Sequence, residues 1–222
     1  DYKCAKYKQI VMTPLDLFNS VAAYQGVVRT TICDIKTICK QFHLCTNKSS
    51  ASVLDFDGAA KVYAKAQTPP VRTPQSVDAI ALDSSKTLLA LIEKKTWEHF
   101  LDHLTNAEKG NPTAAALAKV TTYDLQGKYQ STRTICEYIT GKSGLFDNLS
   151  HVFVFLSEFT DKTTMGGFAD MVIYLGETSS KVDYAIQQQI VAGMRNHLLT
   201  VSCSNSRYLN CMELDEFLKN PY

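Results

Sequence analysis

The segment from Gln75 to Thr96 constrains the fold of this chain more than any other part of the sequence. It contains two mainly apolar runs, residues 77–82 and 87–95, separated by the polar stretch Asp83-Ser84-Ser85-Lys86. Apolar runs of this length on either side of a polar turn predict a β-hairpin. Thr96 then suits the N-cap of a helix, so we expect the second strand to lead directly into a helix.

The residues before this hairpin predict a helix and then strands. Thr13-Pro14 is typical of a helix start, and apolar residues at helical spacing predict one long helix over residues 15–42. Two strands, 53–56 and 61–66, are predicted on either side of Asp57-Gly58, a pair that favours a hairpin turn.

The residues after the hairpin add more elements. Their periodicity predicts helices at 97–104, 112–120, 124–139 and 182–199, and strands at 152–156 and 169–175. This order of elements predicts an α/β fold with a central mixed β-sheet flanked by helices. The 222 residues contain no internal repeat and no linker, so we expect a single domain over residues 1–222.

Charge and cysteine content limit the classes of function. The chain has 23 Lys and Arg against 22 Asp and Glu, so a basic surface for nucleic acid would have to be local. Seven cysteines are an odd number in a chain too large to depend on disulfides, which favours reduced thiols and a cytoplasmic location. No apolar run approaches the roughly 18 residues that span a bilayer, so we expect no membrane segment.

Charged side chains gather at the open end of the predicted hairpin. With Ser84 and Ser85 at the tip of the turn, the numbers of paired residues sum to 169, and Glu93 is diagonal to Asp78. Alternation then directs Asp78, Glu93 and Lys95 to one side of the sheet. The opposite side is expected to be core and holds Val77, Ala79, Ala81, Leu88, Ala90 and Ile92.

Two acids and a lysine on apolar strands need a partner, because a buried charge without one is costly to remove from water. A hard divalent cation such as Mg²⁺, held by oxygen ligands and shared with a substrate phosphate, would supply that partner. If the hairpin lies on the surface instead, water solvates these charges and they imply no site.

These residues resemble the signature of the PD-(D/E)XK nuclease superfamily, which includes restriction endonucleases. The signature is an Asp that opens one strand, followed on the next strand by Glu or Asp, any residue, and Lys; Asp78 and Glu93-Lys94-Lys95 fit it. Val77 departs from it, since the family often has Pro there. The resemblance implies that Asp78, Glu93 and the backbone carbonyl of Lys94 bind Mg²⁺, with Mn²⁺ as a substitute. It also implies that Lys95 orients or activates the attacking water, so that Asp78, Glu93 and Lys95 are catalytic.

The resemblance implies a restriction endonuclease-like core over about residues 13–160, with residues 161–222 as a C-terminal strand and helix extension. The implied function is a metal-dependent nuclease, foremost a DNA endonuclease of restriction type that cuts double-stranded DNA, with a homodimer as one assembly. Analogy with such folds adds Lys128 and Arg133 as nucleic-acid contacts. His99 is a further candidate for contact with a substrate phosphate, because it follows Lys95 closely in the sequence. A non-catalytic interaction module on the same fold and an RNA-directed nuclease stay open as alternatives.

Histidine and cysteine residues offer two weaker metal sites. The set Cys33, Cys39, His43 and Cys45 contains zinc-ligand types but no Cys-x-x-Cys pair, and packed cysteines explain it better. His99 and His103 are four residues apart, without the Glu of a His-Glu-x-x-His motif, and we expect them on the flank of a helix.

Overall fold

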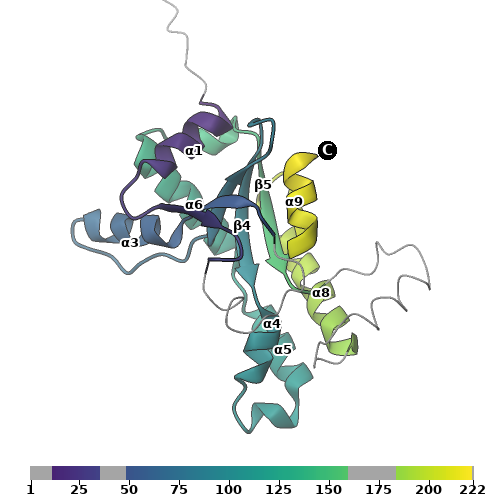
Figure 1. The fold of residues 1–222 in the computed structure, drawn as a ribbon. Coiled ribbons are helices and arrows are strands. Elements are labelled where there is room, and N and C mark those ends of the chain that lie inside the picture. The colour runs from purple at the N-terminus through teal and green to yellow at the C-terminus, as the bar shows by residue number, and fades with distance from the viewer. Residues whose placement is uncertain (1–11, 36–48, 160–183, 222) are drawn as a thin grey trace, which may run out of the picture.

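The computed structural model describes residues 12–35, 49–159 and 184–221, and its centre is a mixed six-stranded sheet (Figure 1). The strands lie side by side in chain order: β1 (Val28–Thr31), β2 (Ser52–Asp55), β3 (Ala79–Leu82), β4 (Leu89–Lys95), β5 (His151–Ser157) and β6 (Ser206–Asn210). Neighbours from β1 to β4 are antiparallel, whereas β4, β5 and β6 run parallel. The predicted α/β fold with a mixed sheet is therefore confirmed.

Helices cover both faces of this sheet. They are α1 (Pro14–Ala22), α3 (Asp57–Ala66), α4 (Trp97–Asp102), α5 (Pro112–Thr121), α6 (Leu125–Thr140), α8 (Tyr184–Leu199) and α9 (Cys211–Lys219), with short 3₁₀ helices at Glu108–Gly110 and Leu145–Asp147. One hydrophobic cluster packs α1, α5, α6 and α8 against the sheet, and a second packs α9 and the segment after β1 against the other face. Figure 1 shows α1 and α6 on one side of β4 and β5, and α9 on the other.

The first helix is shorter than its apolar pattern predicts. Helix α1 ends at Ala22, and β1 begins only six residues later, at Val28. Gly26 has a φ of +83°, a left-handed conformation that turns the chain between the two elements. Residues 36–42 of the predicted helix lie outside the described residues.

The predicted strand over residues 61–66 is wrong, because this segment belongs to α3. Four of its six residues are Ala or Lys, which are good helix formers, and Ala59, Ala60 and Ala64 form the buried side of the helix. Asp57-Gly58 opens this helix instead of turning a hairpin. A side chain at position 58 would meet the carbonyl oxygen of Gly26, so Gly58 allows the close contact between α3 and the turn after α1.

The elements after the hairpin agree better with their predictions. Strand β5 and helices α5, α6 and α8 lie where the periodicity indicates, whereas the predicted strand at 169–175 lies outside the described residues. The last strand and helix, β6 and α9, were not predicted. Among the helices described here, none is both long and apolar enough to cross a membrane.

The hairpin of β3 and β4 forms in a register that differs from the predicted one by two residues. Leu82 is paired with Leu89, so paired numbers sum to 171. The turn is longer than predicted, since Asp83 donates its backbone N–H to the Leu88 carbonyl at 3.1 Å and encloses four residues between them. A shift of two residues leaves every side chain of the paired strands on its predicted face.

Candidate active site

Strand β3 departs from a regular ladder at Asp78, where the hairpin opens. Ala79 is paired with Ile92, yet the backbone N–H of Asp78 also donates to the Ile92 carbonyl at 3.0 Å. Two residues of one strand therefore face one residue of the other, as in a β-bulge, which commonly redirects a side chain. Val77 accordingly packs in the same cluster as Ile80, not on the opposite face as alternation predicted. The alternation argument for the direction of Asp78 thus does not hold.

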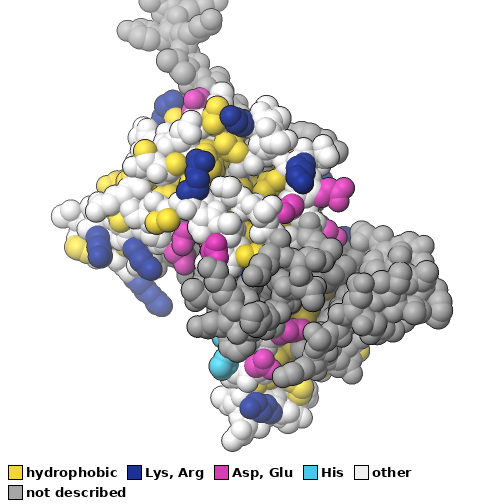
Figure 2. Space-filling view, in the orientation of Figure 1, with side chains coloured by type: hydrophobic (Ala, Val, Ile, Leu, Met, Phe, Trp, Pro, Cys, Tyr) yellow, Lys and Arg dark blue, Asp and Glu magenta, His cyan; other side chains and the backbone are white. Residues whose placement is uncertain are grey.

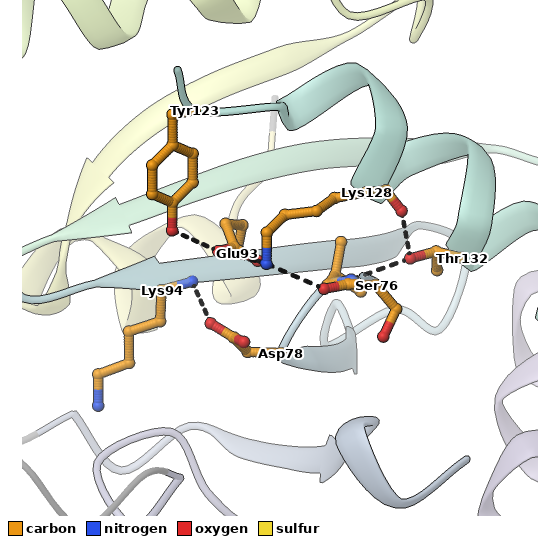
Figure 3. Close-up of polar contacts among 8 residues, drawn as sticks. Ser76, Asp78, Glu93, Lys94, Tyr123, Lys128 and Thr132 are labelled. Carbon is orange, nitrogen blue, oxygen red and sulfur yellow. Dashed lines mark hydrogen bonds and ion pairs between the residues drawn. The ribbon is translucent and has the colours of Figure 1, made fainter. Parts of the chain in front are cut away.

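Asp78 is 1% exposed, and its carboxylate lies against the backbone of β4. Its Oδ2 accepts the backbone N–H of Lys94 at 2.9 Å (Figure 3). In a strand, the N–H and C=O of one residue point toward the same neighbouring strand. The carbonyl oxygen of Lys94 therefore faces the edge at which the Asp78 carboxylate lies.

Glu93 is fully buried, and two residues near the start of α6 converge on its carboxylate (Figure 3). The Tyr123 hydroxyl donates to Oε1 at 2.7 Å, and the Lys128 ammonium lies 2.9 Å from Oε1 and 3.0 Å from Oε2. Burial, and then the negative charges of Glu93 and Asp78, raise the pKa of Tyr123. The charge of Asp78 thus acts on the same hydroxyl that donates a hydrogen bond to Glu93.

The N-terminal half of α6 holds these partners in place. Asp124 caps the helix by accepting the Gly127 N–H at 2.7 Å, which sets the first turn that carries Lys128. Thr132, one turn further along the same face, accepts the backbone N–H of Val77 at 3.0 Å and donates to the Lys128 carbonyl at 2.8 Å. Helix α6 is therefore tied to the start of β3 as well as to Glu93.

The two lysines after Glu93 point to different surroundings. The Lys94 ammonium donates to the Ile32 carbonyl at 3.0 Å, and its residue is buried against the second hydrophobic cluster. The Lys95 ammonium lies over the rings of Trp97 and Phe100, at 5.5 and 5.2 Å from their centroids. Lys95 is thus held near the start of α4 by cation–π contacts.

The three predicted nucleic-acid contacts each interact with another side chain of the protein. Lys128 is engaged with Glu93, and the Arg133 guanidinium pairs with Asp147 at 3.0 Å. His99 lies beside His103, with 4.3 Å between ring centroids, and burial followed by the charges of His103 and Lys95 lowers its pKa. Their contact with nucleic acid stays a prediction.

Basic side chains on the face drawn in Figure 2 are dispersed, apart from a group over α3. This helix and the following loop expose Lys61, Lys65 and Arg72. The sequence prediction that any basic surface must be local agrees with this arrangement.

Glu158, which was not among the predicted site residues, follows β5 directly. It lies beside the end of β4, where Ser157 is paired with Lys95. Its carboxylate accepts the backbone N–H of Glu98 at 2.7 Å, near the N-terminus of α4, and the Ser157 hydroxyl at 3.0 Å. Burial is the main cause that raises the pKa of Glu158 to about 7. An acid directly after an apolar strand was the only sequence signal for it.

The donor atoms at this end of the hairpin suit a hard divalent cation in kind. Two carboxylates and the Lys94 carbonyl are the oxygen ligands that Mg²⁺ and Mn²⁺ prefer. Both oxygens of Glu93, however, lie within 3.0 Å of the Lys128 ammonium. A metal ion could bind Glu93 only if that ammonium moves away.

No protein-family model, curated protein or solved structure matches this chain. The interpretation of the site therefore depends on its own residues. A cluster of three or more His, Cys, Asp or Glu side chains able to hold a metal is absent from the described part of the chain. Of the imagined zinc set, Cys33 is buried, and Cys39, His43 and Cys45 lie outside the described residues.

Proposed function

We propose that this chain is a metal-dependent nuclease that hydrolyses phosphodiester bonds at Asp78, Glu93 and Lys95. The observation that carries the proposal is the burial of two carboxylates, 1% and 0% exposed, where β3 and β4 separate. Burying two acids at the same end of a hairpin costs stability unless their charges are compensated, which makes the pair a candidate for chemistry. The Lys94 carbonyl, which faces the side of β4 where the Asp78 carboxylate lies, would add a third oxygen donor for Mg²⁺ or Mn²⁺.

Each residue has a role that suits this reaction. Asp78, Glu93 and the Lys94 carbonyl would hold the metal ion, which lowers the pKa of bound water and offsets the charge that grows on the phosphate. Lys95 would contribute a positive charge beside the attacking water. Trp97 and Phe100 restrict the Lys95 side chain, so little rotational freedom is lost when it acts.

The finer proposal is a DNA endonuclease of restriction type with a restriction endonuclease-like core. The antiparallel β2, β3 and β4 followed by the parallel β5, with α1 and α6 on one face, supports it as an arrangement of elements. Double-stranded DNA as substrate, an RNA substrate and a homodimer are left for experiment, as is the cytoplasmic location.

A non-catalytic interaction module is the second candidate, and the Lys128–Glu93 ion pair favours it. A lysine that neutralises Glu93 removes the need for a metal ion at that carboxylate. In that case the fold would keep its buried acids only as a structural ion pair.

Cleavage assays separate these candidates. The protein is incubated with supercoiled plasmid, linear DNA and RNA, with Mg²⁺, Mn²⁺ or EDTA, beside Glu93→Ala and the control Glu216→Ala on the exposed side of α9. We expect metal-dependent cleavage that falls at least about a thousandfold in Glu93→Ala and is unchanged in Glu216→Ala. Cleavage that survives Glu93→Ala would refute this site, and no cleavage of any substrate would favour the interaction module.

A further inference from the structure

Three oxygen atoms surround the ammonium group of Lys128. They are Oε1 and Oε2 of Glu93, at 2.9 and 3.0 Å, and the backbone carbonyl oxygen of Ser76, at 3.2 Å (Figure 3). A lysine ammonium has three N–H donors, so this cage satisfies all of them. The same cage, two carboxylate oxygens and a carbonyl, is a set of hard ligands of the kind that binds metal cations.

The oxygen atoms around the ammonium are almost closed to water, whereas part of the Lys128 side chain that carries the ammonium is exposed. The side chain of Glu93 is 1% exposed, whereas that of Lys128 is 15% exposed. The flexible four-carbon stem of lysine lets the ammonium reach solvent without a change in the backbone of α6. The ammonium can therefore move toward solvent while Glu93 stays in place, and a divalent ion bound in its stead would offset the loss of the ion pair.

We propose that Lys128 is a built-in competitor of the metal ion: its ammonium fills the cation position between Glu93 and Ser76 and has to leave before a divalent ion can bind Glu93. The inference rests on the proposed function, because Glu93 is a ligand of the metal site proposed there. The Lys128 ammonium lies against both oxygens of Glu93, at 2.9 and 3.0 Å, so a divalent cation that approaches either oxygen meets a like charge that repels it. Lys128 therefore sets the metal affinity and keeps Glu93 neutralised while no metal is bound.

Lys128→Met tests this proposal, because Met keeps most of the length of the side chain and removes its charge. Mn²⁺ binding is measured by calorimetry on the full chain without nucleic acid. We expect Lys128→Met to bind Mn²⁺ at least about tenfold more tightly than the wild type, and its melting temperature to rise more on addition of Mn²⁺. The matched control, Lys119→Met at an exposed position of α5, should bind Mn²⁺ as the wild type does.

A double variant and a labelling measurement keep the proposal open to refutation. Lys128→Met combined with Glu93→Gln has no unpaired carboxylate, so it should fold without metal and lose the response to Mn²⁺. If Lys128→Met alone does not fold, the wild type is labelled with acetic anhydride instead. Mn²⁺ that displaces the Lys128 ammonium from Glu93 should raise the reactivity of Lys128 several-fold. Unchanged or weaker Mn²⁺ binding in a folded Lys128→Met, or unchanged labelling of Lys128, would overturn the inference.

These results are independent of cleavage. Tighter Mn²⁺ binding by Lys128→Met, together with no cleavage of any nucleic acid, would support the competition and reject the nuclease. Metal-dependent cleavage by the wild type, together with unchanged Mn²⁺ binding in Lys128→Met, would support the nuclease and reject the competition.

Discussion

The two ends of the β3–β4 hairpin both bury acids, and they compensate the charge in different ways. At the turn, Asp83 is 2% exposed, and its carboxylate accepts backbone N–H groups of Ser85, Thr87 and Leu88 at 3.1, 2.8 and 2.7 Å, as well as the Ser85 hydroxyl. Burial raises the pKa of Asp83, but these hydrogen bonds outweigh it and leave the pKa below its usual value. Every donor lies within five residues of Asp83.

At the open end, the partners come from distant parts of the chain. Glu93 on β4 is contacted by Lys128, 35 residues further along, and by Tyr123 from the loop before α6. A carboxylate that holds the backbone of its own turn cannot release those donors without unfolding the turn. A carboxylate neutralised by an ammonium on the flexible stem of a lysine can exchange it for another cation. The comparison therefore suggests a structural role for Asp83 and a chemical role for Glu93.

The largest effect that tests this comparison is on stability. Asp83→Ala should lower the free energy of unfolding by about 3 kcal/mol, because three buried backbone N–H groups lose their acceptor. Glu93→Gln should lower it by no more than about 1 kcal/mol, since Gln keeps an acceptor for Tyr123 and the Lys128 ammonium can turn to water. Urea denaturation of both variants measures the difference. Equal losses, or a larger loss in Glu93→Gln, would contradict the assignment of roles.

Local patterns predicted much of the fold because they depend on neighbours in sequence. The apolar runs of β4 and β5 and the helices α5 and α6 follow from periodicity alone. The prediction for residues 61–66 was wrong because so short a pattern is compatible with a strand and with a helix, and the packing of α3 decides between them. Gly26 and Gly58, which bring α3 against the turn after α1, act through a contact between segments that no local pattern reveals.

The sequence predicted the two acids of the candidate site but not the lysine that pairs with Glu93. Apolar flanks correctly indicated that Asp78 and Glu93 are buried. The extra residue at Asp78 was not predictable, since a bulge has no signature in so short a strand. The ion pair of Lys128 with Glu93 depends on how α6 crosses the sheet, which the sequence of α6 does not specify.

A second prediction concerns Glu158, which adds a third acid near the open end. Burial raises its pKa from 4.5 to about 7 in the folded protein, so the folded state binds more protons than the unfolded state between these values. The stability contributed by protonated Glu158 is therefore full below about pH 4.5 and is lost as the pH rises through about 7. With partial exposure, the loss should be about 2 kcal/mol, below the limit of about 3 kcal/mol set by the shift.

Glu158→Gln should remove this loss. Unfolding free energies of the wild type and the variant, measured between pH 4.5 and 8, should converge at the acidic end and separate at the basic end, with Glu158→Gln the more stable. Glu216→Gln, at an exposed position, serves as the control and should follow the wild type. Parallel curves for the wild type and Glu158→Gln would show that no buried acid at position 158 titrates near neutral pH.

The smallest expected effect comes from variants of Thr132, and it distinguishes a positioning role of this residue from a packing role at the open end of the hairpin. Thr132 is fully buried and accepts the Val77 N–H while it donates to the Lys128 carbonyl. Thr132→Val keeps the volume but leaves that N–H without its acceptor, so it should cost about 1 kcal/mol in unfolding free energy. Thr132→Ser keeps the hydroxyl and loses a methyl group, which should cost a similar amount by packing.

The two variants differ in what they do to the site. If Thr132 only fills space, Thr132→Val and Thr132→Ser should have the same Mn²⁺ affinity. If it aligns the start of β3 with α6, Thr132→Val alone should change the Mn²⁺ affinity, by a few-fold, because Asp78 follows Val77 directly and Lys128 lies one turn before Thr132. Equal affinities would assign the alignment of Asp78 and Glu93 to the bulge in β3 and not to α6, and the open end would then depend on local structure just as the turn does.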